Sequence, residues 1–157
     1  MQPLKWTGPF QIGMLLSSCL DDHRHWPPAD RGVYVITVDV WSVEPNQDCR
    51  PLYVGGNSGK EGRFCTRIGD LVADMFGFFG DTTGHSSGGK TLHGWCRANN
   101  TNPSELYLGW AYRVPWCSRC AEIDAVRLVV LNWSRRREVG LLNKIRPPRC
   151  TEHDEEL

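Results

Sequence analysis

Two short runs rich in β-forming residues, separated by a polar loop, constrain the fold of this chain more than any other feature. The first run, residues 32–41, is dense in β-branched and aromatic side chains and is apolar on both faces at its start. Such a run predicts a strand in the middle of a sheet. The second run, residues 51–54, is shorter and is followed by Gly55 and Gly56. The polar loop between them favours an antiparallel hairpin.

The rest of the chain supplies the elements that would cover and extend this hairpin. Residues 62–76 predict a helix, because their apolar side chains recur at helical spacing as one stripe: Phe64, Ile68, Leu71, Val72 and Met75. Residues 77–90 predict a surface loop, residues 104–114 a third strand, residues 118–133 a second helix, and residues 140–145 a short final element. This order predicts an α/β fold with a small three-stranded, mainly antiparallel sheet flanked by helices.

The length of 157 residues suits a single domain. We expect residues 1–31 to form an irregular or partly helical lead-in, residues 32–148 the domain, and residues 149–157 an acidic tail that is frayed over residues 151–157. The formal net charge is zero, which argues against strong nonspecific binding to nucleic acid but leaves room for local basic patches. We find no convincing export signal and no apolar run long enough to span a membrane, so we expect a cytoplasmic, reducing setting.

Two close-spaced pairs among the cysteines and histidines have the spacing of zinc ligands. One is Cys117 with Cys120, and the other is His93 with Cys96. Together they would make a four-ligand zinc site if the fold brought them together. The alternative is that both pairs arise by chance among incidental thiols, and the sequence leaves the choice open.

The tripeptides Gly32-Val33-Tyr34 and Tyr53-Val54-Gly55, followed by the stretch from Phe64 to Leu71, resemble the motifs of the GIY-YIG endonucleases. The resemblance covers residues 32–148. It implies a hairpin that carries the two tripeptides, an arginine from the first helix, and a glutamate from a later helix that binds one divalent metal. It also implies an asparagine near the end of the domain.

Helical geometry supplies independent grounds for the arginine and the glutamate. Arg67 lies roughly 70° from the centre of the apolar stripe of its helix, at the edge of that stripe, whereas Arg63 points further towards solvent. The alternative role for Arg67 is a surface ion pair with Asp70. Glu122 projects from the apolar face that the later helix makes with its valines, which is costly without a partner or a metal. The alternative for Glu122 is a buried pair with an arginine.

The resemblance also suggests roles for residues outside the helices' apolar faces. Tyr34 would bind and deprotonate the attacking water, with Tyr53 orienting it. His85 or Lys90, from the loop after the first helix, would assist them. Asn143 is the candidate for the closing asparagine, with Asn132 as its competitor.

Gly55 and Gly56 would let the backbone pass close to the substrate. The sequence therefore predicts an endonuclease that hydrolyses DNA with a tyrosine-assisted water and a single Mg²⁺ or Mn²⁺ on Glu122. The alternative is a non-catalytic module that keeps the fold and binds nucleic acid or protein. No separate specificity domain is recognisable, so the loops, a homodimer or a partner protein would supply any preference among DNA sites.

Overall fold

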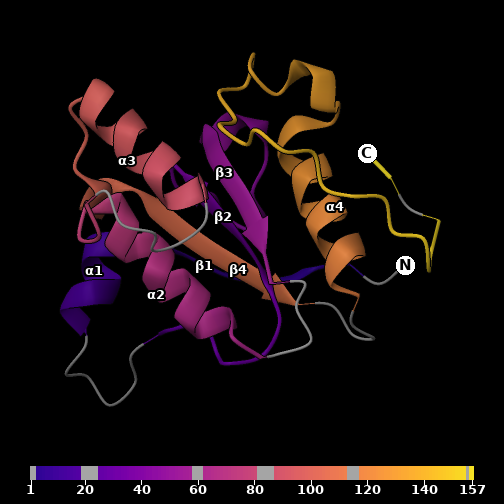
Figure 1. The fold of residues 1–157 in the computed structure, drawn as a ribbon, viewed down its shortest axis with the longest axis horizontal. Coiled ribbons are helices and arrows are strands. Elements are labelled where there is room, and N and C mark those ends of the chain that lie inside the picture. The colour runs from indigo at the N-terminus through magenta and orange to yellow at the C-terminus, as the bar shows by residue number, and fades with distance from the viewer. Residues whose placement is uncertain (1–2, 19–24, 58–61, 81–86, 113–116, 155) are drawn as a thin grey trace.

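The computed structural model describes residues 3–18, 25–57, 62–80, 87–112, 117–154 and 156–157. Its strands are β1 (Lys5–Gln11), β2 (Val33–Thr37), β3 (Pro51–Gly56) and β4 (Tyr107–Tyr112). Its helices are α1 (Ile12–Ser17), α2 (Phe64–Met75), α3 (Ser87–Ala98) and α4 (Ser118–Val130), with short 3₁₀ turns at Gln47–Cys49, Pro103–Glu105 and Trp133–Arg135. The chain is a single α/β domain (Figure 1).

The sheet is antiparallel throughout the described residues, in the order β1-β4-β2-β3. All five residues of β2 are buried, as expected for a strand inside a sheet. The hairpin of β2 and β3 predicted from the sequence is confirmed, with Tyr34 opposite Gly55 and Ile36 opposite Tyr53. The prediction of three strands was wrong, because the described sheet has four.

The additional strand, β1, comes from the segment expected to be an irregular lead-in. Its sequence contains Gly8-Pro9, which ordinarily marks a break in regular structure. β1 lies at the sheet edge and pairs only with β4, with a register shift between Thr7 and Phe10. A proline is tolerated at an edge because it has no N–H to donate to a ladder. This edge position explains why the strand lacks a clear sequence signature.

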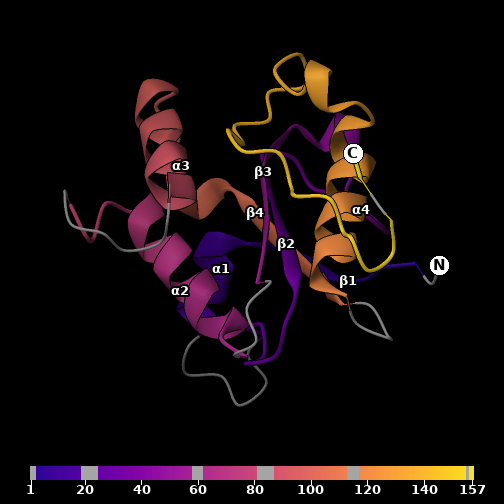
Figure 2. The same cartoon turned by 45° about the vertical axis from the view of Figure 1, so that its right-hand side comes forward.

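Helices cover both faces of the sheet (Figure 2). On one face, the apolar stripe predicted for α2 is buried together with Tyr34 and Ile36 of β2. On the other face, α4 packs against the opposite side of β2 and β3 through alanines and valines, with Val33, Val35 and Val54 beneath it. Two cores therefore form, and residues of β2 alternate between them.

The helix α3 was not predicted at its observed position, where residues 87–90 were expected to belong to a loop. Three glycines in its sequence, Ser-Gly-Gly-Lys-Thr-Leu-His-Gly-Trp-Cys-Arg-Ala, lower its intrinsic helix propensity. Tertiary packing compensates, because α3 contacts both α2 and β3 and buries Leu92 and Cys96. Apolar burial against neighbouring elements stabilises such helices more than propensity does.

The last part of the chain closes the remaining edge of the sheet and then follows α4 (Figures 1 and 2). The Leu142 N–H donates to the carbonyl of Leu52 in β3 at 2.8 Å, which covers part of that strand's open edge. In the tail, Cys150 is buried and Leu157 packs against the apolar residues of α4, whereas residues 151–154 and 156 are exposed. No helix in the described ranges is long and apolar enough to cross a membrane.

Candidate functional site

The two tyrosines of the hairpin lie side by side on one face of the sheet. In the β2–β3 register, Tyr34 is opposite Gly55 and Tyr53 is opposite Ile36, so both side chains project towards α2 and α3. Their ring centroids are 6.2 Å apart and the ring planes are 22° from parallel. Tyr34 is completely buried, whereas Tyr53 is half-buried. Tyr53 is therefore the tyrosine of the pair that solvent can reach.

The glycines after Tyr53 make room for the site's own side chains. A Cβ at Gly55 would lie under 3.0 Å from the Tyr34 hydroxyl, closer than real Cβ atoms come to other atoms. A Cβ at Gly56 would lie 3.5 Å from a carboxylate oxygen of Glu122. The hairpin glycines thus admit Tyr34 from one face of the sheet and Glu122 from the other. From the sequence, these glycines were expected instead to let the backbone pass close to the substrate.

Arg67 and Glu122 reach the tyrosines from opposite sides of the sheet. Arg67 belongs to α2, and Glu122 belongs to α4 beside the end of β3. Both charges act on both tyrosines: Arg67 lowers the pKa of Tyr34 and of Tyr53, while Glu122 raises both. Since such effects require proximity in a partly desolvated region, the four residues form one electrostatic unit. We call Tyr34, Tyr53, Arg67 and Glu122 the tyrosine site.

Burial dominates the acid–base properties of this site. It raises the pKa of Tyr34 well above its ordinary value of about 10, with Tyr53 adding to the effect. It likewise raises the pKa of Tyr53 and of Glu122, and Arg67 opposes both shifts. Both tyrosines are therefore neutral phenols at pH 7 in the free protein. A nearby positive charge would be needed to make either a base.

Arg67 and Glu122 are close enough to interact but are not paired directly. In the part of the chain that the structure describes, no ion pair within 4.0 Å joins them, and the buried Nε of Arg67 has no hydrogen-bond partner. The alternative of a buried arginine–glutamate pair is therefore not what these two residues form. A half-buried carboxylate and an incompletely satisfied guanidinium are suited to bind a cation and an anion from outside.

The other predicted helpers are placed less closely. His85 lies outside the described residues. Lys90 is exposed in the first turn of α3, two residues after Gly88, which packs on Tyr53. Asn132 begins a 3₁₀ turn, where its side chain accepts hydrogen bonds from the backbone N–H and the hydroxyl of Ser134.

Asn143 is buried and its amide is fully engaged with the backbone of β3. Its Oδ1 accepts from the Val54 N–H at 2.9 Å, and its Nδ2 donates to the Val54 carbonyl at 2.7 Å. This two-bond pairing imitates a neighbouring strand along the open edge of β3. The geometry gives Asn143 a bracing role for the strand that carries Tyr53, Gly55 and Gly56.

Sequence reasoning missed the residues that seat α3 on the site. A Cβ at Gly88 would lie 2.6 Å from the ring carbon Cζ of Tyr53, so only glycine lets α3 approach this closely. Gly89 packs equally closely on Asp74 of α2. Asp74 is buried, and its Oδ2 has no hydrogen-bond partner among the described residues. Gly88 and Gly89 fall within the loop predicted over residues 77–90, so the sequence gave no signal of this packing.

A second cluster of potential ligands lies beside α4, away from the hairpin's tyrosine face. It consists of Cys117, Cys120, Cys150 and His153, whose ligand atoms all lie within 4.8 Å of one another. Sequence analysis paired Cys117 and Cys120 with His93 and Cys96 instead. That pairing is not formed, because His93 and Cys96 belong to α3 on the other face of the sheet. There the His93 Nδ1 lies 3.0 Å from the carbonyl of Met75.

The sequence signal for this cluster was a repeated spacing. Cys150-Thr-Glu-His153 has the same three-residue step as Cys117-Ser-Arg-Cys120, but it falls in the segment expected to be frayed. Burial raises the pKa of Cys150, yet hydrogen bonding with His153 and the neighbouring thiols outweighs it and lowers the pKa to about 6. Burial and the same neighbours raise the pKa of Cys120 to about 12.

Comparison with protein-family models, with curated proteins and with solved structures gave no match to this chain. The likeness to GIY-YIG endonucleases therefore remains a resemblance that rests on the residues and their arrangement.

Proposed function

We propose that the chain is a metal-dependent endonuclease that hydrolyses DNA phosphodiester bonds at the tyrosine site. The observation that carries the proposal is that Arg67 of α2 and Glu122 of α4 both act electrostatically on Tyr34 and Tyr53 of the hairpin. Gly55 of that hairpin packs against Tyr34, and Gly56 lies next to Glu122. Four residues distant in sequence supply the three groups that phosphodiester hydrolysis needs. These are a proton acceptor for water, a cation for the phosphate, and a ligand for a metal.

Glu122 fits the metal role by its chemistry and its surroundings. Its carboxylate is half-buried beside Gly56, is not ion-paired with Arg67, and offers the oxygen ligands that Mg²⁺ and Mn²⁺ prefer. When bound there, either ion would supply positive charge that stabilises the phosphate and the leaving 3′ oxygen. A single carboxylate is sufficient in principle, since Mg²⁺ keeps several waters and takes a further ligand from the phosphate.

Arg67 fits the phosphate role. Its guanidinium carries a fork of N–H donors that matches two phosphate oxygens, and its position at the edge of the α2 stripe keeps it half-buried rather than sequestered. A phosphate bound by Arg67 would lie between the tyrosines on one side and Glu122 on the other. The phosphorus could then form a bond to the attacking water oxygen as the bond to the 3′ oxygen breaks.

The tyrosines would handle the proton of the attacking water. Because Tyr34 is fully buried, water would bind on the side of half-buried Tyr53, and both phenols start protonated. Burial is the main cause of both raised pKa values, and the Glu122 carboxylate adds a smaller upward contribution. A cation bound at Glu122 would remove that contribution and add positive charge near both phenols.

Plasmid nicking tests the proposal. Wild-type protein with Mg²⁺ or Mn²⁺ should convert supercoiled DNA to open-circle or linear forms, and Tyr34→Phe, Arg67→Ala and Glu122→Gln should each reduce the rate by about 100-fold or more. Side-by-side branched and flapped substrates would identify the preferred structure.

Matched control variants distinguish chemistry from general damage. Arg63→Ala removes an exposed arginine just before α2, and Asp124→Asn removes a carboxylate two residues from Glu122 that contacts Arg127. Both should cleave at nearly wild-type rates. Equal activity in wild type and all site variants would contradict the nuclease proposal. Metal-independent DNA binding without cleavage, indifferent to Glu122, would favour the non-catalytic module instead.

A further inference from the structure

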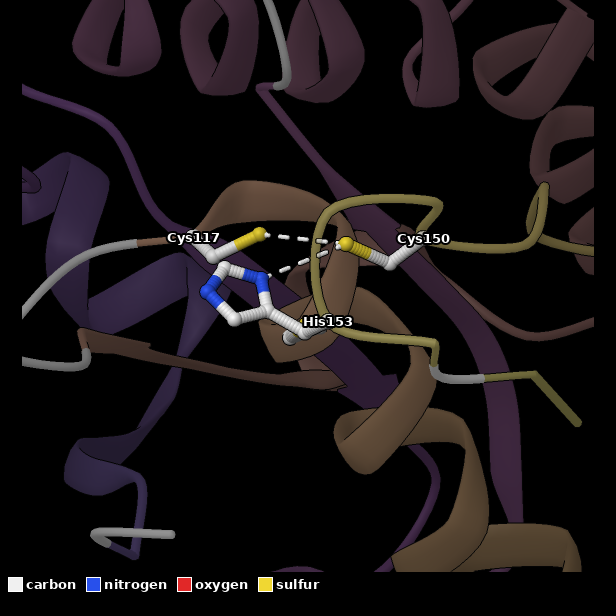
Figure 3. A group of neighbouring side chains, drawn as sticks. Cys117, Cys150 and His153 are labelled. Carbon is white, nitrogen blue, oxygen red and sulfur yellow. Dashed lines mark hydrogen bonds between the residues drawn. The ribbon is translucent and has the colours of Figure 1, made fainter.

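The cluster beside α4 draws its four side chains from two segments of the chain. Cys117 and Cys120 lie immediately before and within the first turn of α4, and Cys150 and His153 lie in the last segment of the protein. Figure 3 shows Cys117, Cys150 and His153 turned towards one another, with the two sulfur atoms and a ring nitrogen innermost. Cys120 and Cys150 are buried, Cys117 is half-buried and His153 is exposed.

All four ligand atoms lie within 4.8 Å of one another, and two of their separations match those of ligands around one tetrahedral zinc ion. The Sγ atoms of Cys117 and Cys150 are 3.6 Å apart, and the Sγ of Cys150 is 3.5 Å from Nδ1 of His153. Tetrahedral geometry with Zn–S and Zn–N bonds of ordinary length places two sulfurs about 3.8 Å apart and a sulfur and a nitrogen about 3.6 Å apart. A disulfide would require the sulfurs to be about 2.05 Å apart.

We propose that Cys117, Cys120, Cys150 and His153 bind a single Zn²⁺ ion as a structural site. Three thiolates and one imidazole are soft and borderline ligands, which select zinc over the oxygen-seeking Mg²⁺ and Ca²⁺. Four protein ligands complete the tetrahedron and leave no open position for a substrate, so the site holds structure rather than performing chemistry. It is separate from the metal site proposed at Glu122, where a carboxylate oxygen would bind Mg²⁺ or Mn²⁺.

The expected effect of this zinc is to fasten the end of the chain to the start of α4. Cys117 and Cys150 are 33 positions apart in sequence, so the ion would close a long loop. Beneath it, Cys120, Ile123 and Cys150 form only a small buried cluster. Ion pairing of Arg149 with Asp154 and a hydrogen bond from Arg127 to the carbonyl of Glu156 lie around the same segment. Because this apolar contact is small, a metal cross-link would add to the stability of the chain end against α4.

Metal analysis of the full chain tests the site. Protein purified under reducing conditions without chelators should contain one zinc per chain by elemental analysis. Substituting cobalt should produce the thiolate charge-transfer and strong visible bands of a tetrahedral site. Cys150→Ser and His153→Ala should hold about a tenth of that zinc or less, because incomplete ligand sets bind weakly. Cys65→Ser, which removes a half-buried thiol outside the cluster, should keep all of it.

His153→Cys covers the case in which a ligand variant fails to fold. His153 is exposed, so this change disturbs little packing, and four thiolates also bind zinc. It should retain one zinc per chain where His153→Ala does not. Three results would overturn the proposal: reduced wild type that takes up no zinc when zinc is supplied, full zinc content in both Cys150→Ser and His153→Ala, or equal zinc loss in Cys65→Ser.

Discussion

The bracing role of Asn143 gives the sharpest quantitative test of the fold around the site. Asn143→Ala removes two buried hydrogen bonds, at 2.9 and 2.7 Å, and leaves the Val54 N–H and carbonyl without those partners. An unsatisfied buried polar group costs about 1–3 kcal/mol, so the pair is worth about 2–6 kcal/mol of unfolding free energy. That is a large part of the stability of a typical domain, which is about 5–15 kcal/mol.

Thermal and urea denaturation would measure this loss. In a domain of this size each kcal/mol shifts Tm by about 2–4 °C, so Asn143→Ala should melt roughly 4–24 °C below wild type. Asn132→Ala is the matched control, because its side chain caps only an exposed 3₁₀ turn. It should cost about 1 kcal/mol or less. Cleavage by Asn143→Ala, measured well below its Tm, should stay within several-fold of wild type.

Two outcomes would refute this reasoning. If Asn143→Ala melts together with Asn132→Ala and wild type, the amide does not brace β3. If Asn143→Ala is as stable as wild type yet inactive, Asn143 acts in the chemistry, as the resemblance first suggested.

Three further predictions concern Gly55, Glu122 and the proposed zinc site. Gly55→Ala places a Cβ against the Tyr34 hydroxyl, so it should cost about 1–3 kcal/mol in urea unfolding and lower cleavage, whereas a wild-type rate and stability would show that the close approach is not real. Burial raises the pKa of Glu122 above its ordinary value of 4.5, so this group favours the fold below that pH and loses its contribution as pH rises through the folded pKa. Without added Mg²⁺, Glu122→Gln should therefore be at least as stable as wild type at pH 7 and lose this advantage near pH 4; a less stable variant at pH 7 would contradict it. A zinc chelator should lower Tm of wild type and leave that of Cys150→Ser unchanged, and acidification should release the zinc because the ligands must be deprotonated.

The hairpin and the two main helices were predictable because their patterns are local. β2 carries a continuous apolar run, and α2 carries one apolar stripe that the structure buries as expected. Glu122 was recognisable because a carboxylate on an apolar face contradicts the pattern of its helix; it lies next to Gly56 of the hairpin, and its proposed metal role stays a prediction.

The missed features depend on packing between distant segments. β1 has no strand signature because it is an edge strand interrupted by Gly8-Pro9. The start of α3 resembles a loop because Gly88 and Gly89 are required for contact with Tyr53 and Asp74 rather than for flexibility. Only the fold shows such a reason.

The proposed zinc ligands also depend on packing between distant segments. The pair His93 and Cys96 has the same spacing as the pair Cys150 and His153, so spacing alone could not show which pair joins Cys117 and Cys120. The sheet separates His93 and Cys96 from Cys117 and Cys120, while the returning chain end brings Cys150 and His153 to the same place.

The central claim is that one divalent metal at Glu122 activates hydrolysis at the tyrosine site. Single-turnover cleavage of a labelled DNA duplex, titrated with Mn²⁺, tests it most directly for wild type, Glu122→Gln and Asp124→Asn. We predict a saturable rise in rate with Mn²⁺ for wild type and Asp124→Asn, and a flat, near-zero rate for Glu122→Gln. Cleavage by Glu122→Gln that rises with Mn²⁺ as in wild type, or no cleavage by wild type at any Mn²⁺ concentration, would contradict the claim.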